Sequence, residues 1–221
     1  MTLQRQEPSA TSHHLGRRGT LIAAAAAAIA DRGFEGVRLR DVAADCGVTT
    51  GMLQHYFSSR EELLVAAFEQ SAFDQVAGWR QAIAGEPGSG ARLHVLLGKM
   101  VEEFSSPMTC VIWTELCATA ARRTELRPLV SHVFEEWHLI IREVVDAAVS
   151  AGVIRPSLPI DDATGILVAA FDGYELDLAS SSGSATPESA SRQIMHLANV
   201  LFPEAEVDRQ QADANLSEIS S

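Results

Sequence analysis

The chain has 221 residues, 47% of them hydrophobic and 21% charged, which is enough apolar sequence for a sizeable core in one or two domains. Its most apolar run, residues 21–30, is far shorter than the ~20 residues of a membrane span, and no basic-then-apolar signal segment opens the sequence. We therefore expect a cytoplasmic protein without membrane contact. The three cysteines have no metal-site spacing and predict reduced thiols, with no disulfide framework and no metal or other cofactor.

The net charge of −12 is unevenly distributed along the chain. Residues 1–60 carry seven arginines against five acidic residues, whereas residues 61–221 carry ten basic and 24 acidic residues. Because charges act over a Debye length of ~10 Å, a partner responds to the local face and not to the total. The distribution permits a DNA-binding first part on an acidic body, although it does not require one.

Helical periodicity dominates the sequence between two polar terminal segments. Apolar residues recur every three or four positions, and no stretch of strand length alternates convincingly between apolar and polar residues. We predict an all-α fold of about nine helices, with flexible tails at 1–14 and 204–221, the second of them acidic. The expected helices span about 17–32, 39–45, 50–56, 59–84, 90–105, 108–122, 125–151, 160–180 and 187–202.

Several residues mark the ends of these helices. Gly33 follows the Ala-rich first helix and is expected to close it. Thr49 can cap the helix over 50–56, and Ser58 with Glu61 has the spacing of a capping box for the next helix. Thr186, followed by a proline, is typical of the start of the last helix.

The two short helices, 39–45 and 50–56, are joined by a turn that contains glycine, which is the pattern of a helix-turn-helix. A helix of two turns is marginal alone and must be held by packing. Leu53 and Phe57 share one side of the second helix, so they are expected to face inward. The opposite side is polar and uncharged, as suits a helix that reads base edges in the DNA major groove.

The candidate DNA-binding residues lie on this unit and at its helix ends. We expect Gln54 and His55 to contact bases, and Tyr56 and Arg60 to contact phosphates. The complete set is Arg38, Arg40, Thr49, Thr50, Gly51, Gln54, His55, Tyr56 and Arg60. An alternative is that the unit is ordinary helix packing, with His55 on the surface and Tyr56 packed against the first helix.

Residues 21–68 resemble the N-terminal domain of the tetracycline-repressor (TetR) family of bacterial regulators. The resemblance rests on the sequence AAAAAAIADRGFEGVRLRDVAADCGVTTGMLQHYFSSREELLVAAF, with the pair Gly33-Phe34, the run Gly47-Val48-Thr49 and the ending His55-Tyr56-Phe57. It implies a DNA-binding domain over 15–75. The chain departs from the family pattern at Val37, where a capping threonine is common, and at Thr50 and Gln54, where lysine and tyrosine are common. The operator sequence therefore stays open.

Beyond residue 75 the resemblance is weaker. The stretch 111–177 is similar to the C-terminal domain of BetI-like repressors, through Trp113, the segment 135–137, Gly152 and the segment 171–174. It implies a ligand-binding and dimerisation domain over 76–203. In this family the last two long helices, here 160–180 and 187–202, form a homodimer interface. Its expected faces consist of Ile166, Ala169, Ala170 and Gly173 on one helix and Ile194, Leu197, Ala198 and Leu201 on the other, unless these residues face the monomer core.

The helices of the body are expected to surround an apolar cavity for a small-molecule effector. The candidate lining residues are Met100, Phe104, Met108, Trp113, Cys117, Phe134, Trp137, His138, Phe171, Asp172 and Tyr174. The alternative for each of them is a filled core. Glu103, Glu115, His138 and Asp172 lie close to apolar stripes and could bind a polar or cationic group of an effector, or could face solvent.

The sequence therefore predicts a dimeric, DNA-binding transcriptional regulator. The favoured interpretation is a repressor that binds a palindromic operator and is released by an unidentified small molecule. Alternatives are an activator, or a regulator controlled without a small-molecule ligand. An enzyme is disfavoured because no Ser-His-Asp set, metal spacing or phosphate-binding loop is recognisable, and burial on one helix explains Cys110 and Cys117.

Overall fold

The computed structural model describes residues 10–181 and 185–205, with side chains from residue 16 onward. Within these ranges the chain is helical and contains no β-strand, so the predicted all-α fold is confirmed. The α-helices are α1 (Ala10–Gly36), α2 (Leu39–Asp45), α3 (Thr50–Tyr56), α4 (Arg60–Ala84), α5 (Ser89–Glu102), α6 (Pro107–Arg122), α7 (Arg127–Ser150), α8 (Ile160–Ser180) and α9 (Pro187–Leu201). Two short 3-10 helices, η1 (Glu103–Ser105) and η2 (Thr124–Leu126), precede α6 and α7.

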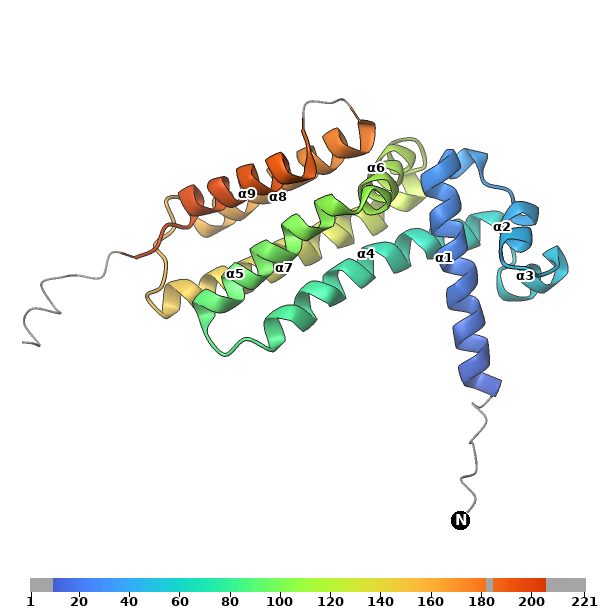
Figure 1. Cartoon of the computed structure of the whole chain (residues 1–221), viewed down its shortest axis with the longest axis horizontal. Coiled ribbons are helices and arrows are strands. Elements are labelled where there is room, and N and C mark those ends of the chain that lie inside the picture. Colours follow the sequence, from blue (N-terminus) through green and yellow to red (C-terminus); the bar gives the residue numbers. More distant parts are fainter. Residues whose placement is uncertain (1–9, 182–184, 206–221) are drawn as a thin grey trace, which may run out of the picture.

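A small head at one end of the molecule consists of α1, α2 and α3 (Figure 1). Its core is built from the residues that the helical pattern placed inward, including Val42, Leu53 and Phe57, all fully buried. Gly47 stands in the turn between α2 and α3 with φ +65°, a left-handed conformation that glycine adopts without a Cβ clash. The packing and this turn together hold the two short helices in place.

Two helix ends differ from the sequence prediction. Gly33, at φ +68°, interrupts the helical conformation as expected, but one further turn follows it, so α1 ends at Gly36. The cap of α4 lies one residue later than expected, because the Ser59 hydroxyl, and not Ser58, accepts a hydrogen bond from the Glu62 backbone amide. The Glu62 carboxylate in turn accepts bonds from the backbone amide and hydroxyl of Ser58. The predicted pairing of Ser58 with Glu61 is therefore wrong by one position.

The body is a bundle of α4 to α9. The long α4 runs from the head along the body, and α8 and α9 lie side by side along the opposite edge (Figure 1). Helix α6 packs against α1, α4 and α8, so it contacts both the head and the body core. Helices α4 and α6 are therefore the elements through which the two parts can influence each other.

The last described residues are attached to the body. Ile154 and Glu204 form an isolated antiparallel bridge, and the Ala205 amide donates to the Val153 carbonyl at 2.9 Å. Residues 204 and 205 of the expected tail over 204–221 are therefore bound to the body, and residues 206–221 lie outside the described residues. At the other end, α1 begins at Ala10, within the segment 1–14 that was expected to be a tail. No helix in the described part of the chain is long and apolar enough to cross a membrane.

Candidate functional site

Helix α3 presents a short polar face to solvent. The Thr49 hydroxyl caps it by accepting from the Met52 amide at 3.2 Å, as predicted. Leu53 is buried beneath the helix, while Gly51, Gln54 and His55 are exposed and Thr50 and Tyr56 are half-buried. A Cβ on Gly51 would meet only the Thr49 hydroxyl, at 4.0 Å. Another molecule can therefore approach the backbone of this face closely.

The candidate arginines of the head fall into two groups. Arg38 and Arg40 are exposed at the start of α2, and Arg40 also pairs with Asp41 at 3.3 Å. Arg60 is different. Its guanidinium donates to the backbone carbonyl of Phe34, at the end of α1, and to that of Val37, in the α1–α2 turn. It also lies 5.1 Å from the Phe34 ring centre. This geometry favours a positioning role for Arg60 over the predicted phosphate contact.

Two further arginines, which were not among the sequence candidates, lie beside α3. Arg17 donates to the Met52 sulfur at 3.6 Å, and the Arg18 guanidinium lies 4.9 Å from the Phe57 ring centre. Both stand on α1, more than thirty residues from α3 in the sequence. The consecutive arginines are visible in the sequence, but only the fold brings them beside α3.

The head is fastened to the body at the end of α1. The Phe34 amide donates to the Glu115 carboxylate of α6 at 2.7 Å. Arg123, which follows α6, lies 4.9 Å from the Phe34 ring centre and pairs with Glu35 at 3.0 Å. Glu115 is thus engaged in a head–body contact, and is not placed to bind an effector in the body core.

An aromatic cluster fills the centre of the body. It contains all three tryptophans of the chain together with phenylalanines and a tyrosine. The rings contact one another at centroid separations of 4.8–6.0 Å, the extremes being Trp113–Trp137 and Phe104–Tyr174. The members are Trp79, Phe104, Trp113, Phe134, Trp137, Phe171 and Tyr174. Trp79 of α4 is the member that the sequence reading missed.

Most of the predicted pocket residues are brought together here, but as a closed core. Phe104, Trp137 and Phe171 are at most 1% exposed, so they are packed on all sides. Met100 is also buried, whereas Met108 is 49% exposed at the start of α6 and does not belong to the cluster. Met108 instead lines a surface groove of about 430 Å³ between α1, α4 and α6.

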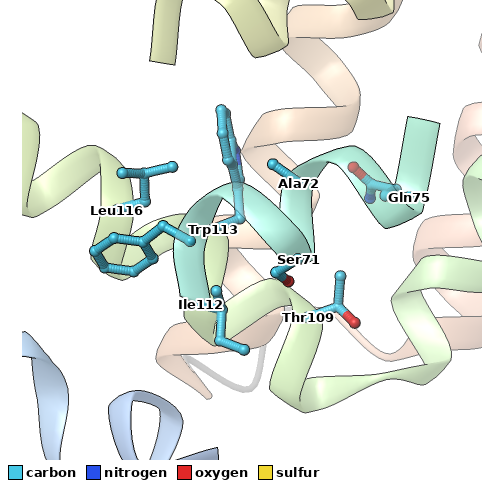
Figure 2. Close-up of a pocket in the computed structure, with 8 residues that line it drawn as sticks. Ser71, Ala72, Gln75, Thr109, Ile112, Trp113 and Leu116 are labelled. Atoms are coloured by element: carbon cyan, nitrogen blue, oxygen red, sulfur yellow. The ribbon is translucent and has the colours of Figure 1, made fainter. Parts of the chain in front are cut away.

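A small void lies beside the cluster, between α4 and α6. Its volume is about 10 Å³, which is room for about one water molecule. Figure 2 shows Trp113, Leu116 and Ile112 of α6 at this void, with the polar ends of Gln75 and Thr109 nearby. Any larger effector would have to displace these side chains.

The remaining candidates have identifiable surroundings. Asp172 accepts a hydrogen bond of 2.5 Å from the Trp113 indole, and the half-buried His138 approaches Gly165. Burial, with added repulsion from Asp172 and Glu175, raises the pKa of the Cys117 thiol to about 12. Burial likewise raises the pKa of the Cys110 thiol to about 12. Both thiols are therefore protonated at neutral pH, which is the less reactive form of a cysteine.

Two family models match the chain. Residues 21–67 match the model of bacterial regulatory proteins of the tetR family. Residues 90–214, more than half of the chain, match the model of the C-terminal domain of BetI-type transcriptional repressors. The chain belongs to the TetR family. It is a DNA-binding transcriptional regulator, as the helix-turn-helix and the resemblance predicted.

Individual relatives agree with this assignment. The transcriptional repressor KstR2 of Rhodococcus jostii is 25% identical over 151 residues, which cover 68% of this chain and 74% of that protein. The crystal structure of a TetR-family regulator from a Rhodococcus species is similar with a TM-score of 0.71 and 26% identity, over 84% of this chain and 98% of that one. A regulator from Saccharomonospora viridis in complex with choline shares the fold, with a TM-score of 0.75 at 16% identity, over 85% and 98% of the two chains.

Proposed function

We propose that this TetR-family regulator is a cytoplasmic, dimeric repressor that binds a palindromic operator and is released by a small molecule. The observation that carries the proposal is the face of α3. Its exposed amide and imidazole groups, Gln54 and His55, are held by the buried Leu53 and flanked by arginines. Polar uncharged groups suit base edges, and arginines suit phosphates.

The outer face of α8 and α9 supports dimerisation. Ile166, Leu176 and Val200 are 43–54% exposed, and Gly173 has nothing within 4 Å of the position of a Cβ. Ala169 extends this apolar stripe along α8. In contrast, Ile194, Ala198 and Leu201 of α9 are buried in the monomer, so the face expected for α9 is wrong for these three residues. In a dimer with its two-fold axis through the exposed stripe, each α3 helix would contact one of two half-sites about 34 Å apart.

The contacts of α6 support regulation by an effector. Helix α6 carries Trp113, which belongs to the aromatic cluster, and Glu115, which holds the Phe34 amide of the head. Rearrangement of the cluster would therefore shift the head through a single rigid element. An effector releases DNA only if it binds the released conformation better, and coupling of about 1–3 kcal/mol is typical of such systems.

A regulator without a small-molecule ligand is the second candidate. It is favoured by the packed core of the body, since Trp137 and Phe171 are at most 1% exposed. Activation of transcription in place of repression is a further alternative.

Binding to a duplex recovered by this protein from a random pool tests the proposal. The proposal predicts two protomers per duplex and a strong decrease in affinity with salt, because arginine contacts release counterions from the DNA. One protomer per full site, or affinity that is independent of salt, would contradict it.

A further inference from the structure

Met52 is an apolar side chain at the edge of the polar face of α3. It is 38% exposed, and among the described residues of α1, α2 and α3 it is the one exposed large hydrophobic side chain. Single exposed apolar residues are common on protein surfaces and need no function. The position of Met52 and the contact of its sulfur distinguish it from such a residue. It was not among the sequence candidates.

The position of Met52 is in the first turn of α3, where it is the third residue of the helix. In helix-turn-helix proteins, residues near the start of the second helix contact base edges. By the helical repeat, Gly51 and His55 mark the outward direction of α3, with Met52 on one side of it and Gln54 on the other. Met52 is therefore placed to enter the major groove together with Gln54.

The backbone of Met52 is held on both sides. Its amide donates to the Thr49 hydroxyl at 3.2 Å, and the next residue, Leu53, is fully buried beneath the helix. The preceding residue, Gly51, has no side chain, and only the Thr49 hydroxyl lies within 4.0 Å of the position of a Cβ there. DNA can therefore come close to the helix at this point without displacing a neighbouring side chain.

The side chain of Met52 is held by Arg17. The Arg17 guanidinium, on α1, donates to the Met52 sulfur at 3.6 Å, and both residues are exposed. A methionine side chain is unbranched and flexible, so this contact restricts it to fewer conformations. A guanidinium has several N–H donors, and those not directed at the sulfur stay available for a phosphate. The contact thus orients the thioether and keeps a positive charge beside it.

The chemistry of a thioether selects its partner in the groove. Methionine has no N–H or O–H group to donate, and its sulfur, a weak acceptor, already faces Arg17. Among the groups that the four bases present in the major groove, the 5-methyl group of thymine is the apolar one. A polarizable and adaptable apolar side chain packs favourably against such a group. Thymine is therefore the base that fits Met52.

We propose that Met52 reads the 5-methyl group of one thymine in each half-site of the operator, and that Arg17 is the positioning residue that holds its thioether there. This inference rests on the proposed function, because it names a base of the operator that α3 binds. Met52 and Gln54 then read different groups, since one packs against a methyl group and the other forms hydrogen bonds with a base edge.

Deoxyuridine tests the proposal, because it differs from thymidine only by the absence of the 5-methyl group and still pairs with adenine. The operator recovered by the wild-type protein from a random pool is synthesised with each thymine in turn replaced by uracil, at the symmetric position of both half-sites. Exposure of one buried carbon group weakens binding about fourfold, so loss of both methyl groups should weaken it about 15-fold. The loss should occur at one position and not at the other thymines.

Variants of Met52 assign the effect to this side chain. Met52→Ala should bind the thymine and uracil duplexes equally, whereas Met52→Leu, with an apolar side chain of similar volume, should keep the preference for thymine. Thr50→Ser is the matched control, since it removes the other methyl group at the start of α3, and its preference should be that of the wild type. A preference that is retained in Met52→Ala, or abolished only in Thr50→Ser, would overturn the proposal.

A pair of arginine variants tests the positioning role of Arg17. Arg17→Ala should lower the ratio of thymine to uracil affinity, because the thioether is no longer held. Arg18→Ala is the control, since Arg18 stands over the Phe57 ring at 4.9 Å and makes its contact on the other side of α3 from Met52. It should weaken binding to both duplexes alike. An unchanged ratio in Arg17→Ala would overturn the positioning role.

Failure of this inference is distinguishable from failure of the proposed function. An enriched palindrome that contains no thymine in its half-sites, or one that binds equally with uracil at every position, would overturn the role of Met52 while operator binding stands. Enrichment of no sequence by the folded protein would instead contradict the proposed function, and with it the reading of thymine. Because Met52 and Arg17 are exposed, their variants should unfold at the temperature of the wild type, which circular dichroism would confirm.

Discussion

The backbone amide of Phe34, at the end of α1, donates a 2.7 Å hydrogen bond to the carboxylate of Glu115, 81 residues later in α6. Because hydrogen bonds to charged groups contribute about 1.5–3 kcal/mol, Glu115→Ala should lower the free energy of unfolding by that order. It should also reduce the effect of an effector on DNA affinity, since it removes one of the contacts that join α6 to the head. Urea unfolding and DNA titrations with and without effector would measure both changes.

Gly33 provides an independent check of this junction. A Cβ there would lie 3.2 Å from the Glu115 carboxylate, and Gly33 has φ +68°. Gly33→Ala should therefore destabilise the protein by about 1–2 kcal/mol. Wild-type stability in both variants would show that the junction is not held as described.

Arg60 should act through the structure of the head. Its guanidinium holds the carbonyls of Phe34 and Val37, so Arg60→Ala should lower thermal stability and weaken binding to all DNA sequences alike. Arg60→Lys should restore neither the stability nor the DNA binding, because an ammonium group lacks the planar set of donors of a guanidinium. The salt dependence of DNA binding should stay unchanged.

Removal of the Arg18 or the Arg38 side chain is the matched comparison for Arg60→Ala, because both of these arginines are exposed in the head. Loss of one phosphate contact should reduce the slope of log affinity against log salt concentration by about one unit. A reduced slope in Arg60→Ala, with no change in stability, would instead show that Arg60 makes the phosphate contact that the sequence predicted.

Gln54 is exposed on α3 and is expected to read a base. Gln54→Ala should relax the preference at one base pair per half-site, with a cost of about 1–3 kcal/mol on the preferred sequence. Competition binding with singly substituted operators would identify that base pair. Equal losses on every operator would assign Gln54 to the backbone instead.

Leu176 is 54% exposed on the outer face of α8. A charge there would be buried without a partner in the proposed dimer, so Leu176→Glu should give folded monomers with weak operator binding. Light scattering coupled to size exclusion would give the mass. Met108→Glu, at a similarly exposed residue of α6, should remain dimeric, and a dimeric Leu176→Glu would place the interface elsewhere.

The pH dependence of stability should identify Glu175. Since burial raises its pKa in the folded state, the wild type loses stability relative to Glu175→Gln as pH rises from the ordinary value of 4.5 through the raised pKa. At pH 8 the variant should be more stable, by about 1.4 kcal/mol for each pH unit that separates the raised pKa of the folded state from the ordinary pKa. At pH 4, where both side chains are neutral, the difference should disappear. A less stable variant at pH 8 would show that Glu175 is ionised and compensated in the fold.

The helices and the exposed polar face of α3 were predictable from local sequence. The periodicity, the Thr49 cap and the inward pair Leu53 and Phe57 depend on residues within a few turns of one another. The cap of α4 was misplaced by one residue because Ser58 and Ser59 are both suitable, and packing makes the choice.

The relationships between distant helices were not predictable in this way. Glu115 resembled a surface residue or an effector ligand until the fold placed it beside the Phe34 amide. Glu175 stands on the same face of α8 as Phe171, but only the packing of η1 and α6 shows that it is completely buried. For α9, the direction of Ile194 was decided by packing within the monomer.

Selection of bound sequences from a random duplex pool at physiological salt would show whether the polar face of α3 reads DNA. A palindrome whose half-sites lie about one helical turn apart should be enriched. The Gln54→Ala variant should enrich a related palindrome that is degenerate at one position in each half. If the folded wild-type protein enriches no sequence, even after dialysis against ligand-free buffer, the polar face of α3 is not a DNA-reading surface and the account is contradicted.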